Sequence, residues 1–398
     1  MTTEPVTDWT SDYDILDPEY VTNPHPVWDD LRQTCPVAHS PRWGGSWMPT
    51  RYADVFAVAH DVVHFSSRDV GVLTFSAEDR PPGNMNLPVP PIDADGELHT
   101  WTRRLLLPWF SHTQVAVYEP VTRELCNRLI DGFIANGTVD AAADYAQQIP
   151  VRVIAQILGV PLELADTFTG WVRDVLEFAH DEVRSKRGFD GIVGFLLQQL
   201  SDRRADPADD LISSLLQEEV NGEPIPDMTI MGMAALTLVA GVDTTWSAIG
   251  SAMWHLATHP EHAHRMIDEP EIVPAAIEEL LRAYSPVTMA RIATEDVEFQ
   301  GCPIKSGEKV LLNFASANRD PEMFAHPDVV DFDRAENRHV AFGAGIHRCA
   351  GSNLARMELR VAVEEWLRRI PEFRLADEAD VTWAGGQVRG PRTVPVVF

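Results

Sequence analysis

The stretch AFGAGIHRCAG, residues 341 to 351, decides the fold of this 398-residue chain. It holds three glycines, at Gly343, Gly345 and Gly351. Glycine permits positive φ angles and close backbone approach, so the stretch predicts a tight loop pressed against a flat partner. A helical apolar periodicity follows directly and ends before Pro371. The single cysteine of the loop, Cys349, therefore precedes a helix N-terminus, where free N–H groups and the helix dipole favour a thiolate over a thiol.

Two interpretations of Cys349 are open on this evidence: an inert buried cysteine in a glycine turn, or a thiolate ligand for iron. The whole stretch resembles the heme-ligand signature of the cytochrome P450 family, F-x-x-G-x-x-x-C-x-G. Phe342, Gly345, Cys349 and Gly351 fill that signature, and His347 fills its bacterial variant G-x-H-x-C. The resemblance implies that Cys349 binds the iron of heme b (iron protoporphyrin IX), with Gly343 also in the heme loop.

The longest predicted helix spans residues 225 to 261, with Asp227 as its N-cap. Its centre, Ala240-Gly241-Val242-Asp243-Thr244-Thr245, matches the family motif A-G-x-[DE]-T-T. The resemblance implies a catalytic role for all three of Gly241, Asp243 and Thr244: a groove for dioxygen at the glycine, and proton relay by the acid and the hydroxyl. The alternative is structural, with Thr244 bonded to a carbonyl one turn earlier and Asp243 in a salt bridge.

Other phrases of the family occur in the same order along the chain. Glu279 and Arg282 fill its E-x-x-R motif, and Arg334 stands where a second arginine completes a buried structural pair; by itself, E-x-x-R reads as a surface ion pair. His99 and Arg103 are four residues apart and share one face of a helix predicted over 98 to 111. A heme carries two propionates that need cationic or donor partners, which the resemblance assigns to a set of four residues. That set is His99, Arg103, Arg291 and His347.

The substrate pocket is expected to draw apolar side chains from several segments. The resemblance assigns it to the irregular stretch from 64 to 98, the central helix, the segment after Pro286 and the C-terminal hairpin tip. The residues are Val72, Leu73, Phe75, Met85, Leu87, Leu236, Val239, Ala240, Val287, Met289 and Val388. Their character predicts a hydrophobic small molecule. Ser66, Ser67 and Arg68 could anchor a substrate carboxylate, or Arg68 could be paired at the surface.

The fold implied by the resemblance is mainly α with a smaller β region. It is the cytochrome P450 fold, one triangular-prism domain over residues 1–398, with heme between the central helix and the Cys349 loop with its following helix. We expect no fused reductase or ferredoxin domain, because the chain contains no flavin or iron–sulfur motif. Two helices are predicted over 163 to 200, joined near Arg184 to Asp190.

Composition excludes several classes of partner. The net charge of −28 argues against binding to nucleic acid or to an anionic membrane. The acidic N-terminal segment resembles neither a signal peptide nor an anchor, so we expect a soluble, cytoplasmic, monomeric protein of the bacterial type. The four cysteines show no disulfide or zinc spacing. His255, His259, His262 and His264 are expected to form a solvated helix end rather than a metal site.

The function implied is that of a heme-thiolate monooxygenase, which inserts one oxygen atom of dioxygen into a hydrophobic substrate by hydroxylation or O-dealkylation. Electrons would come from a separate ferredoxin and its reductase, docking on Arg104, Arg348, Arg356 and Arg360. A peroxide-driven oxidase or peroxygenase is one alternative, although that branch usually lacks the acid–alcohol pair kept here. A non-catalytic heme protein that binds a ligand is the other.

Overall fold

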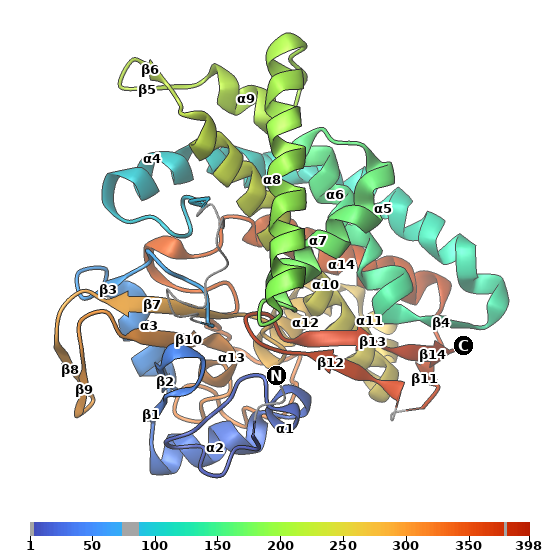
Figure 1. Cartoon of the computed structure of the whole chain (residues 1–398). Coiled ribbons are helices and arrows are strands. Elements are labelled where there is room, and N and C mark those ends of the chain that lie inside the picture. The colour runs from blue at the N-terminus through green and yellow to red at the C-terminus, as the bar shows by residue number, and fades with distance from the viewer. Residues whose placement is uncertain (1–3, 74–86, 378–379) are drawn as a thin grey trace. The chain divides into compact units, whose positions relative to one another are not determined.

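The computed structural model describes residues 4–73, 87–377 and 380–398. Phe75 and Met85, both predicted to line the pocket, lie outside the described residues. The chain divides into two compact units. Unit 1 comprises residues 1–83, 278–349 and 383–389, and unit 2 comprises residues 84–277, 350–382 and 390–398. Figure 1 shows the elements of both units along the chain.

Unit 1 contains most of the β structure. Its strands are β1 (Val37–Ser40), β2 (Ser46–Pro49), β3 (Phe65–Ser66), β7 (Thr288–Ala293), β8 (Val297–Phe299), β9 (Cys302–Ile304) and β10 (Lys309–Asn313). Its helices are α1 (Pro18–Thr22), α2 (His25–Thr34), α3 (Tyr52–His60) and α13 (Phe314–Ala317). Five strands form one sheet in the order β1-β2-β10-β7-β3, and β8 and β9 form a separate two-stranded sheet. Strand β2 is followed directly along the chain by helix α3.

The two faces of the central strands β7 and β10 are both buried. Alternate residues of a strand point to opposite faces, and Ala290 and Leu311 accordingly join one hydrophobic cluster while Leu312 and Ala293 join another. Antiparallel pairing sets Met289 opposite Leu312 and Arg291 opposite Val310. The sheet therefore holds Arg291 on a strand that is packed on both sides.

Unit 2 is mainly helical. Its helices are α4 (Gly96–Leu106), α5 (His112–Phe133), α6 (Gln148–Leu158), α7 (Ala165–Leu176), α8 (Glu182–Ala205), α9 (Leu211–Gln217), α10 (Asp227–Thr258), α11 (Pro260–Asp268) and α14 (Ser352–Arg369). Its strands are β4 (Thr138–Asp140), β5 (Glu219–Val220), β6 (Glu223–Pro224), β11 (Arg374–Leu375), β13 (Gly390–Thr393) and β14 (Pro395–Val397). Helix α12 (Val273–Ala283) and strand β12 (Thr382–Ala384) cross the division between the units. The prediction of a mainly helical chain with a smaller β part is confirmed.

Helix α10 is the core of unit 2 and packs against α6, α7, α8, α14 and β13. Glycines permit the closest approaches. A Cβ atom at Gly241 would lie 2.5 Å from the Cδ1 atom of Ile154 on α6, and one at Gly232 would lie 1.9 Å from the backbone oxygen of Pro88. Within the described residues, α10 alone is long and apolar enough to cross a membrane, but it is largely buried, as a core helix is.

Two predictions of local structure are wrong. Asp227 is the first residue of α10 rather than its N-cap, which is Pro226, and its carboxylate pairs with Arg204. The helices over 163 to 200 are joined at residues 177–181, so the stretch from Arg184 to Asp190 lies inside α8. Asp181 caps α8 by accepting a hydrogen bond from the backbone N–H of Arg184 at 3.1 Å.

Candidate active site

The cysteine loop is a backbone-bonded turn of unit 1. The N–H of Cys349 donates to the carbonyl of Phe342 at 2.8 Å, and the N–H of Arg348 donates to Gly345 at 3.1 Å. Gly343 and Gly345 have φ angles of 72° and 68°, which favour glycine. The Cys349 side chain is exposed at the end of this loop, three residues before α14. The backbone thus presents the sulfur of Cys349 to the surroundings of unit 1 rather than to its core.

Helix α3 holds this loop from one side. A Cβ atom at Gly345 would lie only 2.4 Å from the backbone oxygen of Ala59, near the end of α3. Real Cβ atoms do not approach a backbone oxygen so closely. The absence of a side chain at residue 345 is therefore a condition of the packing between α3 and the loop.

His347 and Arg291, two predicted partners of the heme propionates, both belong to unit 1. The Nε2 atom of His347 lies 2.9 Å from the hydroxyl oxygen of Ser67, a buried residue just after β3. Arg291, on β7, is buried, and its Nη1 atom donates to the carbonyl of Ala290 at 2.8 Å. A buried guanidinium favours a nearby anion, because an isolated charge is costly away from water.

The other two predicted propionate partners lie on α4 in unit 2. His99 is buried and Arg103 is half-buried, one turn apart on the same helix. Thr102 lies between them in the sequence, and its hydroxyl donates to the carbonyl of Leu98, one turn earlier in the same helix, at 2.6 Å. The predicted helix over 98 to 111 is confirmed as far as Leu106, after which a 3₁₀ turn continues to Phe110.

One face of α10 is half-buried along the middle of an otherwise buried helix. Leu236, Ala240, Thr244 and Ala248 succeed one another at four-residue intervals, and each is only partly covered. Residues four apart lie on the same side of a helix, so these four form one stripe. The hydroxyl of Thr244 donates to the carbonyl of Ala240 at 2.7 Å within this stripe.

Asp243, next to Thr244, is almost completely buried and faces a cation. Its Oδ1 atom lies 2.8 Å from the Nη2 atom of Arg392 on β13. Within the described residues, neither oxygen of Asp243 accepts a hydrogen bond of good geometry, so the charge of Arg392 is what compensates the carboxylate. Burial raises the pKa of Asp243 above its ordinary value of 3.8, and Arg392 partly opposes that rise.

The ion pair extends to α7 and the residue after it. Arg392 also donates from Nε to Glu177 at 3.0 Å, and Glu177 receives two further hydrogen bonds from Arg173, at 2.8 and 2.9 Å. Burial raises the pKa of Glu177, but the two arginines outweigh it and hold the pKa below 4.5. The guanidinium of Arg392 lies 4.2 Å from the ring centroid of Trp246, a cation–π contact. The result is a row of alternating charges that begins at the buried Asp243 and ends at the half-buried Arg173.

Both contacts of the structural alternative for the motif on α10 are observed: Thr244 is bonded one turn back and Asp243 is in a salt bridge. These contacts are compatible with proton relay, because a hydroxyl that donates to a carbonyl still has lone pairs to accept from a donor. Arg392 and Glu177 were not predicted. Neither belongs to a local motif, and 215 residues separate them in the sequence.

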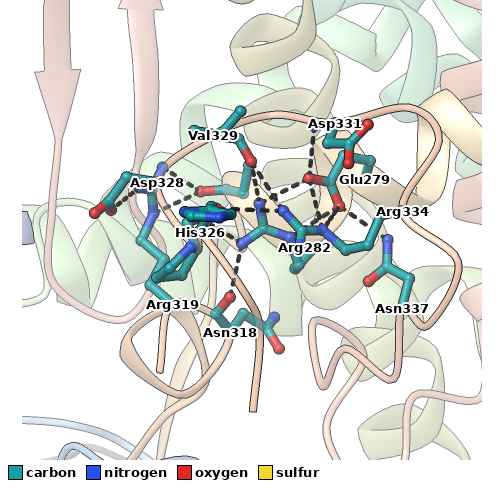
Figure 2. A network of polar contacts seen from close by, with 12 residues as sticks. Glu279, Arg282, Asn318, Arg319, His326, Asp328, Val329, Asp331, Arg334 and Asn337 are labelled. Atoms are coloured by element: carbon teal, nitrogen blue, oxygen red, sulfur yellow. Dashed lines mark hydrogen bonds and ion pairs between the residues drawn. The ribbon is translucent and has the colours of Figure 1, made fainter. Parts of the chain in front are cut away.

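The buried Glu279 and Arg282 form a network with the half-buried Arg334 in unit 1, which Figure 2 shows. The guanidinium of Arg282 binds both oxygens of Glu279 at 2.8 Å, and Arg334 Nε reaches the same two oxygens at 3.1 and 3.0 Å. The remaining N–H groups of Arg282 donate hydrogen bonds to the backbone carbonyls of Asn318, Pro327 and Val329. The simpler reading of Glu279 and Arg282 as a surface ion pair is wrong, because both side chains are fully covered.

The cytochrome P450 family model matches residues 163–379, which include the cysteine loop, Asp243, Thr244 and the Glu279 network. The chain belongs to the cytochrome P450 family. It is 34% identical to the mycinamicin IV hydroxylase/epoxidase of Micromonospora griseorubida, over 93% of this chain and 94% of that one. It is 35% identical to the vitamin D(3) 25-hydroxylase of Pseudonocardia autotrophica, over 98% and 97%.

Solved structures of the family agree. The bacillaene polyketide synthase cytochrome P450 PksS of Bacillus subtilis matches with a TM-score of 0.87 and 29% identity, covering 97% of this chain and 99% of that chain. P450 proteins bind heme, and the relatives are oxidoreductases. This P450 is therefore an enzyme of the monooxygenase family, acting on small molecules.

The residues present fit a heme. Cys349 offers an exposed soft sulfur on a rigid loop, as a thiolate ligand of iron requires. The predicted propionate partners supply donors of the right kind, two of them buried at His99 and Arg291. On the half-buried stripe of α10, the residues around Thr244 are apolar: Leu236, Ala240 and Ala248.

The predicted pocket residues of unit 1 fall into two groups. Val287 pairs with Val388 in an antiparallel bridge, and Gln387 donates to the sulfur of Met289 at 3.4 Å, so the strand and the hairpin tip lie side by side. Val72 is buried in a hydrophobic cluster against which Leu73 packs.

The other described pocket residues belong to unit 2. Leu87 is buried, and its neighbour Pro88 contacts α10 at Gly232. Gly232 lies one turn before Leu236 on that helix. Val239 and Ala240 are half-buried on α10.

The histidines after the motif differ from the prediction of a solvated helix end. His255 is buried, its ring stacks on His259 at 4.3 Å, and its Nε2 atom lies 2.8 Å from Nδ1 of His262. Burial lowers the pKa of His255 to about 2. Within the described residues, no three His, Cys, Asp or Glu side chains are placed to hold a metal ion.

Proposed function

We propose that this P450 is a heme-thiolate monooxygenase in which Cys349 provides the axial ligand of heme b. His99, Arg103, Arg291 and His347 would hold the propionates, and Phe342, Gly343 and Gly351 would complete the heme loop. When bound, the heme supplies dioxygen activation, with the thiolate favouring cleavage of the O–O bond. The reaction proposed is hydroxylation or O-dealkylation of a hydrophobic small molecule, as one domain over residues 1–398.

The observation that carries the proposal is the buried Asp243 beside the half-buried hydroxyl of Thr244. Asp243 is charged against Arg392 yet has oxygens without well-aligned donors among the described residues, so it can accept a proton and release it again. Thr244 is the neighbouring group on the half-buried stripe and can hold water or substrate-side oxygen in place. Acid and hydroxyl together support proton delivery, which a protein that only binds heme would not need.

Gly241 has a packing contact in the structure, with its missing side chain directed at Ile154. A role in making room for dioxygen stays a prediction that rests on the family motif. The pocket residues Leu236, Val239 and Ala240 lie on the same half-buried part of α10 as Thr244, which supports an apolar substrate wall.

The proposed electron donor is a separate ferredoxin that meets arginines on the surface. Of the four arginines predicted to bind the ferredoxin, we retain the exposed Arg104 and Arg348 and the half-buried Arg356, and call these three the docking set. We exclude Arg360, because its guanidinium pairs with Glu119 at 2.6 Å and Glu364 at 3.2 Å. We further propose a monomeric, cytoplasmic enzyme without membrane or nucleic-acid partners, in keeping with the acidic composition.

A reduced-versus-carbon-monoxide difference spectrum of the purified protein, with Cys349→Ala beside it, tests the proposal. A strongly red-shifted Soret band that is lost in the variant is the expected result. A heme band without that shift in the parent protein would overturn thiolate ligation. Cys126, buried on α5, offers the matched control: Cys126→Ala should keep the parent spectrum.

A further inference from the structure

Two cysteines far apart in the sequence meet in unit 1. Cys35 follows the end of α2, and Cys302 is the first residue of β9. Their thiols are directed at the same atom: the sulfur of Cys35 lies 3.6 Å from the carbonyl oxygen of Val37, and that of Cys302 lies 3.8 Å from it. The two sulfur atoms can therefore be no farther apart than these two distances together.

The surroundings allow the two sulfurs to react with each other. Both side chains are partly exposed, whereas Cys126 is buried. A thiol is a weak hydrogen-bond donor, so turning either sulfur away from Val37 towards the other costs little. Burial raises the pKa of each thiol, and the negative charge of an ionised Cys35 raises the pKa of Cys302 further. One thiolate at a time is enough for disulfide chemistry, so the pair should oxidise slowly rather than not at all.

The hairpin that carries Cys302 is attached to the rest of unit 1 by non-covalent contacts, such as the hydrogen bond from Gln300 to Asp54 at 2.7 Å and the packing of Phe299 on Phe65. Among the residues that the structure describes, strands β8 and β9 pair only with each other, with Phe299 opposite Cys302. A two-stranded hairpin is marginally stable by itself. A covalent link to residue 35 would tie this hairpin to the segment that leads from α2 into β1.

We propose that Cys35 and Cys302 are a modification site, at which a peroxide forms an intramolecular disulfide. In the first step one thiolate attacks the peroxide oxygen, giving a sulfenic acid and releasing hydroxide, which takes up the proton lost by the thiol. In the second step the other sulfur displaces the hydroxyl group of the sulfenic acid, which leaves as water. Two thiols lose two electrons and two protons, and hydrogen peroxide is reduced to two molecules of water.

The test is a peptide map of the heme-loaded protein after treatment with hydrogen peroxide, alkylation of free thiols and digestion without reductant. We expect a cross-linked peptide that contains Cys35 and Cys302 and disappears after dithiothreitol. Cys35→Ser and Cys302→Ser should each abolish it, and Cys126→Ser should retain it. The result does not depend on the axial ligand, so it can fail or succeed independently of the proposed function.

A second readout measures the effect on stability. A disulfide that closes a long loop stabilises chiefly by restricting the unfolded chain, so the oxidised protein should melt on the order of a few degrees higher than the reduced protein. Cys35→Ser should show no oxidant-dependent shift. Full alkylation of both cysteines after peroxide, or a cross-link that uses Cys126 in place of either, would overturn the proposal.

Discussion

Arg392 Nη2 lies 2.8 Å from Asp243 Oδ1, and Arg392 Nε lies 3.0 Å from a carboxylate oxygen of Glu177. One guanidinium on β13 thus pairs with two acids, the buried Asp243 of the proposed proton relay and the half-buried Glu177. Burial raises the pKa of Asp243, Arg392 lowers it and Glu177 raises it. The proton affinity of Asp243 therefore depends on residues that no sequence motif contains.

Arg392→Gln should move product formation to higher pH. The relay needs the ionised carboxylate before each proton uptake, and removal of the cation raises the pKa of Asp243 further. Breaking a buried pair should also lower the free energy of unfolding by roughly 3 kcal/mol. The measurements are product formed per NADH against pH, and urea unfolding.

Glu177→Gln should shift the same pH profile in the opposite direction, because it removes the negative charge that raises the pKa of Asp243. Arg392→Lys keeps the charge and is the control for packing. If Arg392→Gln and Glu177→Gln left the pH profile where it is in the parent enzyme, Arg392 would have a structural role only.

Thr244→Ala should uncouple electron use from product formation. Without the hydroxyl, proton delivery loses a positioned group, and we expect product per NADH consumed to fall about tenfold or more while peroxide rises. The assay uses a substrate found by its spin-state shift. Thr237→Ala on the same helix is the control, since Thr237 donates to Met233 in the same one-turn bond at 2.9 Å. Equal product yields in both variants would contradict a relay role for Thr244.

Glu279→Gln should destabilise unit 1 strongly. It leaves Arg282, which is fully covered, and Arg334 without their shared carboxylate, at a cost of about 3–5 kcal/mol in the free energy of unfolding. Glu336→Gln is the matched control, because its pair with Arg338 is exposed on both sides and should contribute less than about 1 kcal/mol. Equal losses in urea unfolding for the two variants would refute the distinction.

Glu358→Gln should stabilise the protein at neutral pH. Glu358 is buried on α14, and burial raises its pKa well above the ordinary 4.5. The native state holds the proton longer than the unfolded state, so stability is fully present below about pH 4.5 and is lost as pH rises towards the native pKa, at about 1.4 kcal/mol per pH unit. In Glu358→Gln, the free energy of unfolding should no longer fall with pH in this way. Glu261→Gln, exposed on α11, should keep this dependence on pH.

Charge reversal at Arg104 or Arg348 should raise the ferredoxin concentration needed for half-maximal reduction. Both arginines are exposed, so substrate affinity measured by spin-state titration should not change. Arg374→Glu, exposed on β11 and outside the docking set, is the control. Reduction kinetics equal to those of the parent enzyme would remove these arginines from the proposal.

Sequence alone predicts the parts of the site whose residues are neighbours in the chain. The Cys349 loop and the motif around Asp243 each lie within about ten residues, so spacing is informative. Arg392 and Glu177 carry no such signal, because only the packing of β13 against α10 brings them to Asp243. The approach of Cys35 and Cys302 to each other carries no such signal either, because Cys302 contacts Val37 from 265 residues away in the sequence.

The position of the break between α7 and α8 could not be predicted for a related reason. The basic, glycine-containing stretch from Arg184 to Asp190 is typical of a connection. In the structure Asp174 binds Arg184 at 3.0 Å and Arg187 at 2.8 Å, which stabilises helix there. Tertiary ion pairs override local propensity at this point.

The contact between Ala59 and Gly345 makes mutational tolerance at the two positions unequal. The atom that Ala59 contributes is a main-chain oxygen, which every amino acid supplies, so this contact sets no restriction on the residue type at 59. Residue 345 must have no side chain and must adopt a φ angle of 68°, and only glycine meets both conditions. In a library that randomises both positions, functional clones should be uniform at 345 and varied at 59 within the limits of a buried site.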